Sequence, residues 1–115
     1  MNIIGKTYLG SDIKSIEITK SIIPNSKSIL ITGMHHAREP MSFSMNLFII
    51  LKLLREYSMS NENALKLLRT RNLYFIPIIN VDGYKANNLC YEKEKVLEKC
   101  QIRKNRNNNF NNNCY

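Results

Sequence analysis

Two short apolar runs on either side of a long apolar helical segment limit this chain to a small set of folds. The first run, Ser28–Thr32 (SILIT), is rich in β-branched residues and ends at Gly33, which predicts an interior strand covered on both faces. The second run, Leu73–Ile79 (LYFIPII), also has strand character, although Pro77 weakens its end or places the strand at a sheet edge. Strand, helix and strand in this order predict an α/β sheet with at least one right-handed crossover.

Two helices are expected between these strands. Apolar residues occur almost all round the segment from Met41 to about Tyr57, so this helix should pack on more than one side. Asn61–Arg69 has separate polar and apolar sides at helical spacing, which predicts a second helix. A further strand is expected at Ile13–Ile18, and a turn at Asn80–Gly83 should end the second apolar run.

The length and the net charge of the chain limit the number of domains and the kinds of partner that can be expected. With 115 residues, of which 43% are apolar, the chain suffices for one compact domain. The net charge of +8 suits an acidic partner, but the basic residues are spread along the chain. Over residues 92–99 glutamates alternate with lysines, which indicates a solvated helical face. No nucleic-acid partner is therefore predicted.

No membrane span is predicted either. The most apolar run, Leu47–Leu54, is interrupted by Lys52 and is much shorter than the roughly 20 residues that cross a bilayer. Met1–Gly10 lacks the charged start and apolar run of a signal peptide, so the sequence leaves the localisation open.

The last quarter of the chain differs from the rest in composition. Cys90, Cys100 and Cys114 are odd in number and none belongs to a C-x-x-C pair, so incidental or free thiols are expected. From Asn105 the sequence is dominated by asparagine (NRNNNFNNNCY), which cannot bury enough apolar area to order itself. We expect a polar, Asn-rich surface insertion at about 85–115.

The segment Gly33–Pro40 (GMHHAREP) carries the chemistry. It lies between the carboxyl end of a predicted strand and the start of a helix, where open α/β sheets bind their ligands. His36 and Glu39 are three residues apart, and an imidazole nitrogen and a carboxylate oxygen both bind Zn²⁺ at about 2 Å. From these residues alone the alternative stays open that Glu39 only complements the helix dipole and the histidines are merely exposed.

The neighbouring residues make a family resemblance specific. G-M-H-H-A-R-E-P resembles the G-x-H-x-R-E-[WP] segment of zinc carboxypeptidases of the carboxypeptidase A/B family. In that family the His and Glu are two of the three protein ligands of the catalytic zinc. The resemblance implies that His36 and Glu39 are ligands, that His35 is a neighbour, and that Arg38 lines the substrate cleft.

Two later segments agree with this resemblance in order. Asn80–Tyr84 (NVDGY) looks like the family's N-P-D-G-[YF], with Val81 in place of proline. Arg103–Arg106 (RKNR) is similar to the family's R-K-x-R, and the resemblance gives Arg106 the role of polarising the scissile carbonyl and stabilising the oxyanion. Between Gly83 and Arg103 the chain is longer than the family usually is, which predicts an insertion at a wall of the cleft.

The resemblance implies a fold, a cofactor and an activity. Residues 1–115 would be the N-terminal portion of a mixed-sheet zinc-carboxypeptidase fold with flanking helices, that is, a partial catalytic domain. The complete protein would be a Zn²⁺-dependent metalloprotease that hydrolyses the C-terminal peptide bonds of peptides or proteins. The third zinc ligand and the general base of the family have no counterpart in this sequence, so we expect a truncated chain that is inactive alone.

Three other hypotheses about the function of this chain remain open from the sequence. A zinc deacylase of the aspartoacylase type shares His-x-x-Glu, but its segment usually runs G-x-H-G-N-E, and Ala37-Arg38 argue against it. A non-catalytic carboxypeptidase-like binding module and a gene fragment that aggregates through an exposed strand edge are the others.

Overall fold

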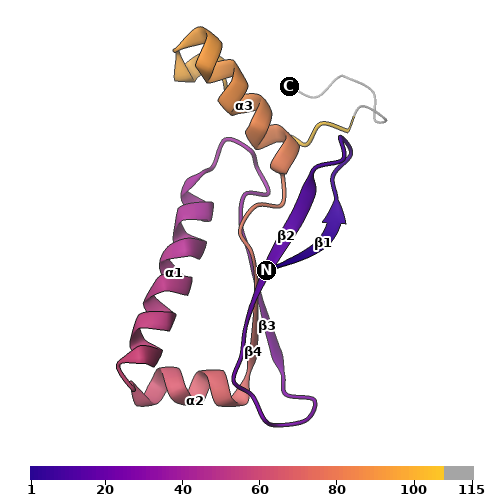
Figure 1. The fold of residues 1–115 in the computed structure, drawn as a ribbon. Coiled ribbons are helices and arrows are strands. Elements are labelled where there is room, and N and C mark those ends of the chain that lie inside the picture. The colour runs from indigo at the N-terminus through magenta and orange to yellow at the C-terminus, as the bar shows by residue number, and fades with distance from the viewer. Residues whose placement is uncertain (108–115) are drawn as a thin grey trace.

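The structure, a computed structural model, describes residues 1–107. The elements in that range are shown in Figure 1. In chain order they are β1 (Asn2–Lys6), β2 (Asp12–Ile18), β3 (Ser28–Thr32), α1 (Met41–Ser58), α2 (Glu62–Thr70), β4 (Asn72–Ile76), α3 (Val81–Glu94) and the short 3-10 helix η1 (Leu97–Lys99). The predicted strands β2 and β3 and the predicted helices α1 and α2 are confirmed, whereas β1 was not predicted.

The strands form one mixed sheet. Within residues 1–107 its order is β1-β2-β4-β3. β1 and β2 pair antiparallel, β2 and β4 also pair antiparallel, and β3 and β4 pair in parallel. Parallel neighbours need a crossover connection, which α1 and α2 provide. The expected mixed α/β sheet with flanking helices is confirmed.

Of two expectations about strand position, one is wrong for the described residues and the other is confirmed in one of its two alternatives. β3 was expected inside the sheet with both faces covered, but it pairs with β4 alone, and Leu30 is 62% exposed. Pro77 was expected either to weaken the end of the second run or to place the strand at an edge; β4 does end before Pro77, but it lies between β2 and β3. The physical reason is that β4 ends at Ile76, so the missing N–H of Pro77 removes no bond from the ladder.

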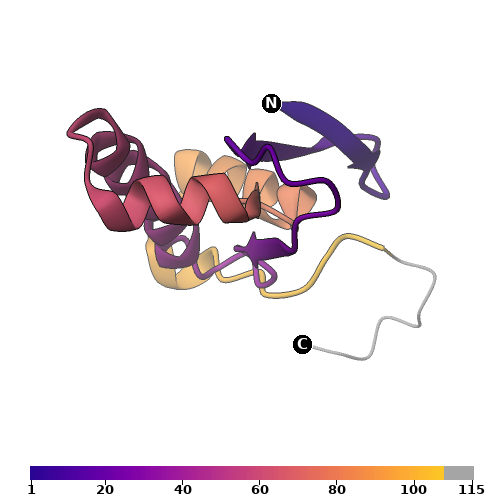
Figure 2. The same cartoon turned by 90° about the horizontal axis from the view of Figure 1, so that it is seen from below.

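The hydrophobic core lies between the sheet and the two crossover helices. Its buried members come from α1, α2 and β4, namely Ile50, Leu68, Leu73 and Phe75. Seen from below, α2 runs from the end of α1 across to the sheet, so both helices contribute to this core (Figure 2). None of the helices within residues 1–107 combines the length and hydrophobicity that a bilayer-spanning segment requires.

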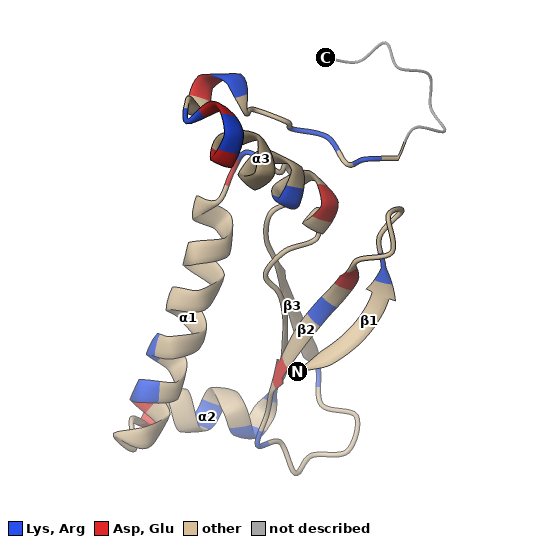
Figure 3. Ribbon diagram, turned by 45° about the horizontal axis from the view of Figure 1, so that its top comes forward, with Lys and Arg blue, Asp and Glu red and all other residues tan. Residues whose placement is uncertain are grey.

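The expectation that α1 packs on more than one side is also wrong for the described residues. Only Asn46 and Ile50 of this helix are buried. Met41, Phe48 and Leu51 are 74%, 58% and 66% exposed. The charged residues of α1 lie toward its C-terminal end (Figure 3). The side of the helix that faces away from the core is therefore exposed and largely apolar. The cause is that the described residues provide packing partners on the core side alone.

The stretch after β4 is more ordered than its composition suggests. Asn80–Gly83 was expected to be a turn, but α3 begins at Val81 and continues to Glu94. Lys95 is the C-cap of this helix and has a left-handed backbone conformation. The chain then folds back through η1. Of the Asn-rich run expected as a surface insertion, residues 108–115 lie outside the described residues.

Cys90 and Cys100 form a disulfide, with their Cα atoms 5.6 Å apart. The expectation of free thiols is therefore wrong for this pair. The reversal of the chain after α3 brings the two cysteines together, and no spacing rule in the sequence signals such a reversal. Cys114 lies outside the described residues.

Asp82 ties the start of α3 to the turn between β1 and β2. Its carboxylate accepts hydrogen bonds from the Thr7 hydroxyl at 2.7 Å and from the Leu9 amide at 3.0 Å, and the residue is only 5% exposed. Burial acts to raise the pKa of Asp82. The hydrogen bonds from Leu9, Thr7 and Ser11 and the nearby Lys85 ammonium outweigh it, and the pKa lies below its ordinary value.

The substitution Asp82→Asn tests this anchor. The lowered pKa means that the ionised carboxylate stabilises the fold at any pH above the ordinary value of 3.8, and that this stabilisation is lost as the pH falls through the folded-state value. We expect the variant to lose on the order of 1–2 kcal/mol of unfolding free energy at pH 7. The difference from the parent chain should shrink as the pH falls below that ordinary value, as measured by urea denaturation at several pH values.

Asp12→Asn is the matched control, because Asp12 is paired with Lys6 at the surface rather than bound by buried donors. Its effect at neutral pH should be smaller than that of Asp82→Asn. Equal effects of the two substitutions, or an Asp82→Asn effect that is the same at every pH, would contradict the anchor.

Candidate metal centre

The loop between β3 and α1, which carries the predicted ligands, begins with a glycine that no larger residue could replace without a shift. A Cβ at Gly33 would lie 2.7 Å from the side-chain nitrogen of Asn46 and 2.7 Å from the backbone oxygen of Pro77. The Gly33 amide donates to Ile76 at 2.9 Å, and its carbonyl accepts from Ile79 at 3.1 Å. The loop therefore leaves the sheet pressed against both α1 and the chain that follows β4.

The next residues turn sharply toward α1. Met34 is 1% exposed and has a φ of 47°, a left-handed conformation that is costly for a residue with a side chain. The backbone amide of Met34 is held in place because it donates to the Ser42 hydroxyl at 2.8 Å. That hydroxyl in turn donates to the carbonyl of Glu39 at 2.9 Å. Ser42 thus closes the loop by holding its two ends together.

His36 and Glu39 face each other within this closed loop. The Nδ1 atom of His36 lies 3.0 Å from each carboxylate oxygen of Glu39, and the Glu39 amide donates to the His36 carbonyl at 3.1 Å. Their side chains are 37% and 53% exposed, so the pair is open to solvent. Pro40 follows at the N-cap of α1, so Glu39 stays outside the helix.

The spacing of the pair fits two ligands of one zinc ion. Two bonds of about 2 Å that meet at a tetrahedral ion separate the donor atoms by about 3.3 Å. The observed 3.0 Å between His36 Nδ1 and the Glu39 oxygens needs only a small rotation to reach that value. His35 is a different case, because its Nε2 atom lies 3.3 Å from the Thr32 hydroxyl.

A third ligand is not found beside this pair. Among residues 1–107, no group of three His, Cys, Asp or Glu side chains is placed to hold a metal ion. The whole sequence has only two histidines, which are the neighbours His35 and His36. The described residues therefore hold one facing His–Glu pair, without a third such side chain placed to share a metal ion with it.

Asn80 joins the second predicted segment to this loop. Its side-chain nitrogen lies 3.3 Å from the carbonyls of both His35 and Arg103, to which it donates, and its side-chain oxygen accepts from the Gly83 amide at 3.1 Å. Its own amide donates to Met34 at 2.9 Å. One residue, 5% exposed, therefore links the loop after β3, the start of α3 and the segment Arg103–Arg106.

The third predicted segment also reaches the loop through its backbone. The Ala37 amide, between His36 and Arg38, donates to the Arg103 carbonyl at 3.0 Å. The side chains of Arg38, Arg103 and Arg106 are exposed, and no hydrogen bond or ion pair of their guanidinium groups occurs within residues 1–107. The structure thus brings the three segments together, but it leaves the arginine side chains in solvent.

Some residues that build this site were not singled out from the sequence. Asn87 is 8% exposed and bonds to both Ala37 and Ile102, yet it lies between the two later segments and belongs to neither. Asp82 was noted only as part of a segment. The signal available for Asn87 was its place on a helix face that also carries Gly83, but no periodicity predicted that α3 existed.

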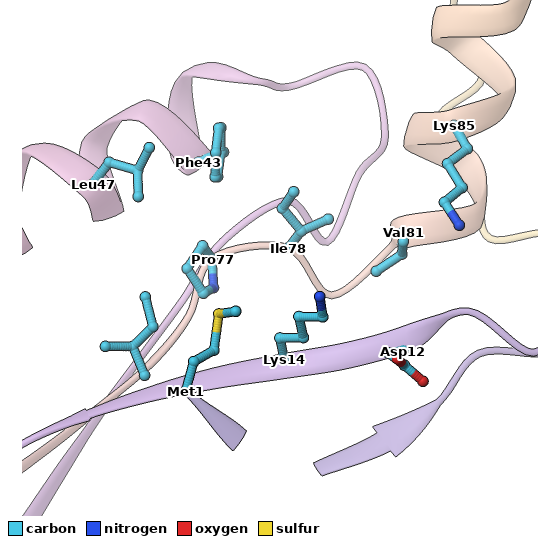
Figure 4. A pocket seen from close by; sticks show the side chains of 10 residues that line it. Met1, Asp12, Lys14, Phe43, Leu47, Pro77, Ile78, Val81 and Lys85 are labelled. Carbon is cyan, nitrogen blue, oxygen red and sulfur yellow. The ribbon is translucent and has the colours of Figure 1, made fainter. Parts of the chain in front are cut away.

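A cavity of about 420 Å³ lies apart from this site, between β2, the start of α1 and the loop from β4 to α3 (Figure 4). Its lining includes Lys14, Phe43 and Pro77. None of the predicted metal ligands or arginines lines it, so this hollow is not the place of the predicted chemistry.

Comparison with known sequences identifies the family. The model of the zinc carboxypeptidases, peptidase family M14, matches residues 1–115. The inactive metallocarboxypeptidase ECM14 of Saccharomyces cerevisiae is 34% identical over 84 residues, which cover 70% of this chain and 19% of that protein. A zinc carboxypeptidase of Saccharothrix mutabilis subsp. capreolus is 30% identical over 82 residues, again covering 70% and 19%. The chain thus spans about a fifth of the length of these relatives.

Solved structures agree on the fold. The crystal structure of thrombin activatable fibrinolysis inhibitor matches with a TM-score of 0.78 and 25% identity, over 98% of this chain and 26% of that one. Bovine thrombin-activatable fibrinolysis inhibitor, in complex with tick carboxypeptidase inhibitor, matches with a TM-score of 0.70 and 26% identity, over 98% and 32% of the two chains. The match along the whole sequence and the shared fold show that this chain belongs to the zinc carboxypeptidase family.

Proposed function

We propose that this chain supplies half of the zinc site of a metallocarboxypeptidase that hydrolyses C-terminal peptide bonds. The observation that carries the proposal is the facing of His36 and Glu39 at 3.0 Å, in a loop at the carboxyl end of β3, in a member of this family. In this role both side chains bind Zn²⁺. When bound, zinc lowers the pKa of its water and polarises the substrate carbonyl.

The arginines would serve the substrate rather than the metal. Arg38 lines the cleft beside the ligands, and Arg106 stabilises the charge that develops on the carbonyl oxygen. Arg103 is a second candidate for the latter role, because its carbonyl is bonded directly to Ala37 and Asn80 of the site. Guanidinium groups suit this task because they remain charged and donate several hydrogen bonds.

The isolated chain should be catalytically inactive. A catalytic zinc needs three protein ligands and an open position, and this sequence offers two ligands and no second suitable histidine. Full activity, substrates and partners belong to the whole protein of which such a segment is about a fifth in its relatives.

A non-catalytic carboxypeptidase-like module is the second candidate. The observation that favours it is that several relatives, including the one from Saccharomyces cerevisiae, are named inactive metallocarboxypeptidases. The presence of both His36 and Glu39 in this chain favours the zinc-binding reading. The family match also favours a carboxypeptidase over a deacylase of the aspartoacylase type.

Zinc titration of the purified chain tests the half-site. We expect weak one-to-one binding by calorimetry, which His36→Ala and Glu39→Ala each weaken by at least about tenfold, since even outer-shell changes cost that much at metal sites. His35→Ala and Glu92→Ala are the matched controls, because they remove the same residue types elsewhere and should leave the affinity unchanged. An affinity that falls with His35→Ala as much as with His36→Ala would overturn the assignment. Chelator-sensitive release of C-terminal residues from model peptides would show that the chain is active alone.

An anionic ligand tests the arginines. A peptide phosphonate carries a tetrahedral anion like the one that develops during hydrolysis, and its binding to the zinc-loaded chain can be followed by NMR titration. We expect Arg106→Ala to weaken binding by on the order of tenfold, the effect of losing one charged hydrogen bond. Lys104→Ala removes a charge from the same segment and should change little. If Arg103→Ala alone has the larger effect, Arg103 carries the role, and equal losses in all three variants would mean unspecific charge attraction.

A further inference from the structure

The segment that follows α3 runs back along this helix toward the metal-binding loop. Contacts at three levels join them: the Cys90–Cys100 disulfide, the hydrogen bonds of Asn87 with Ile102, and the bond from Asn80 to the Arg103 carbonyl. The helix residue number falls from level to level as the number in the returning segment rises. The two pieces of chain are therefore antiparallel and fastened at both ends.

At the second of these levels, the side chain of Asn87, in the middle of α3, also contacts the loop that carries His36 and Glu39. Its side-chain nitrogen donates to the Ala37 carbonyl at 3.1 Å and to the Ile102 carbonyl at 2.9 Å. Its side-chain oxygen accepts from the Ile102 amide at 2.8 Å. Both donors of the side-chain amide and its oxygen thus have partners, as expected for a side chain that is only 8% exposed.

These bonds fix a register. The amide engages both the N–H and the C=O of Ile102, as a neighbouring strand would, and at the same time it holds the carbonyl of Ala37. The backbone bond from Ala37 to Arg103 lies directly beside it. A shift of the returning segment by one residue would break all of these bonds together, and it would leave buried donors and acceptors without partners.

We propose that Asn87 is a positioning residue that sets the register of the arginine segment, residues 102–106, against the loop that carries His36 and Glu39. The register follows from the contacts alone, and only its use in placing an arginine beside the metal rests on the proposed function. Asparagine suits the position because aspartate keeps the acceptor but has no donor, and would face two carbonyl oxygens with a negative charge.

The test is site-resolved amide hydrogen exchange by NMR in the 115-residue chain, in Asn87→Asp and in Asn88→Asp. Asn88 is the matched control, because it is exposed, carries the same amide and would receive the same charge one residue further on. In Asn87→Asp we expect the amides of Ala37 and Ile102 to exchange at least about tenfold faster, because the carboxylate loses both donated bonds and repels the carbonyls of Ala37 and Ile102, which releases the returning segment. The amides of β4, around the fully buried Phe75, should keep the parent rate, and Asn88→Asp should change neither group.

Two results would overturn the proposal. One is unchanged exchange at Ala37 and Ile102 in Asn87→Asp. The other is faster exchange of the β4 amides to the same degree, which would make Asn87 a general support of the fold. Asn87→Ala removes the amide without adding charge and should show the same local pattern, and if both variants lose the folded core the residue is not a local positioning device.

Zinc titration of the same samples separates this inference from the proposed function. Binding should persist in Asn87→Asp with little change, because neither ligand is altered, while the affinity for the peptide phosphonate falls by on the order of tenfold. If no variant binds zinc but the exchange pattern holds, the proposed function fails and the register stands. If all variants bind zinc and the exchange is unchanged, the register fails and the metal site stands.

Discussion

The site depends first on the buried side chain and backbone of Asn80. Its amide nitrogen, side-chain nitrogen and side-chain oxygen bind the loop after β3, the arginine segment and the first turn of α3. Three stretches of chain that are far apart in sequence meet at this residue. A buried amide with all of its groups satisfied specifies one arrangement, since any other leaves polar atoms unpaired away from water.

The sheet makes this junction possible. β3 and β4 are parallel neighbours, so the loops after their carboxyl ends lie on the same edge of the sheet, which is where open α/β sheets bind ligands. The loop after β3 brings His36 and Glu39, and the loop after β4 brings Asn80. Gly33 lets the first loop approach the second without a clash, and the core around Phe75 holds the two strands together.

Local elements of the fold could be predicted from the sequence, and those that depend on distant parts of the chain could not. The signals for SILIT and for the helix from Met41 lie within the segments themselves, so the predicted bounds agree with β3 and α1 to within about a residue. The position of β3 in the sheet and the exposed side of α1 depend on what packs against them, which local pattern does not encode. Only the end of α3 was indicated, by the alternating charges of residues 92–99, because the apolar residues of this helix have no regular face and its buried residues are Asn87, Asp82 and Gly83.

The residues of the candidate site also differ in how far the sequence could predict them. His36 and Glu39 could be proposed as ligands from a short segment because both belong to one loop, and the structure places the two side chains face to face. The role of Arg106 remains a proposal, and the structure adds Arg103 as a rival because its carbonyl touches the loop. The Cys90–Cys100 disulfide could not be deduced, since pairing requires the reversal after Lys95.

We propose that His36 and Glu39 bind one zinc ion together. X-ray absorption spectroscopy of the zinc-loaded chain can decide this, because it reports which atoms are bound to the metal. We expect an imidazole signature together with oxygen ligands at about 2 Å, and loss of the imidazole signature in His36→Ala. Sulfur ligands at about 2.3 Å, or an imidazole signature that survives in His36→Ala, would contradict the account.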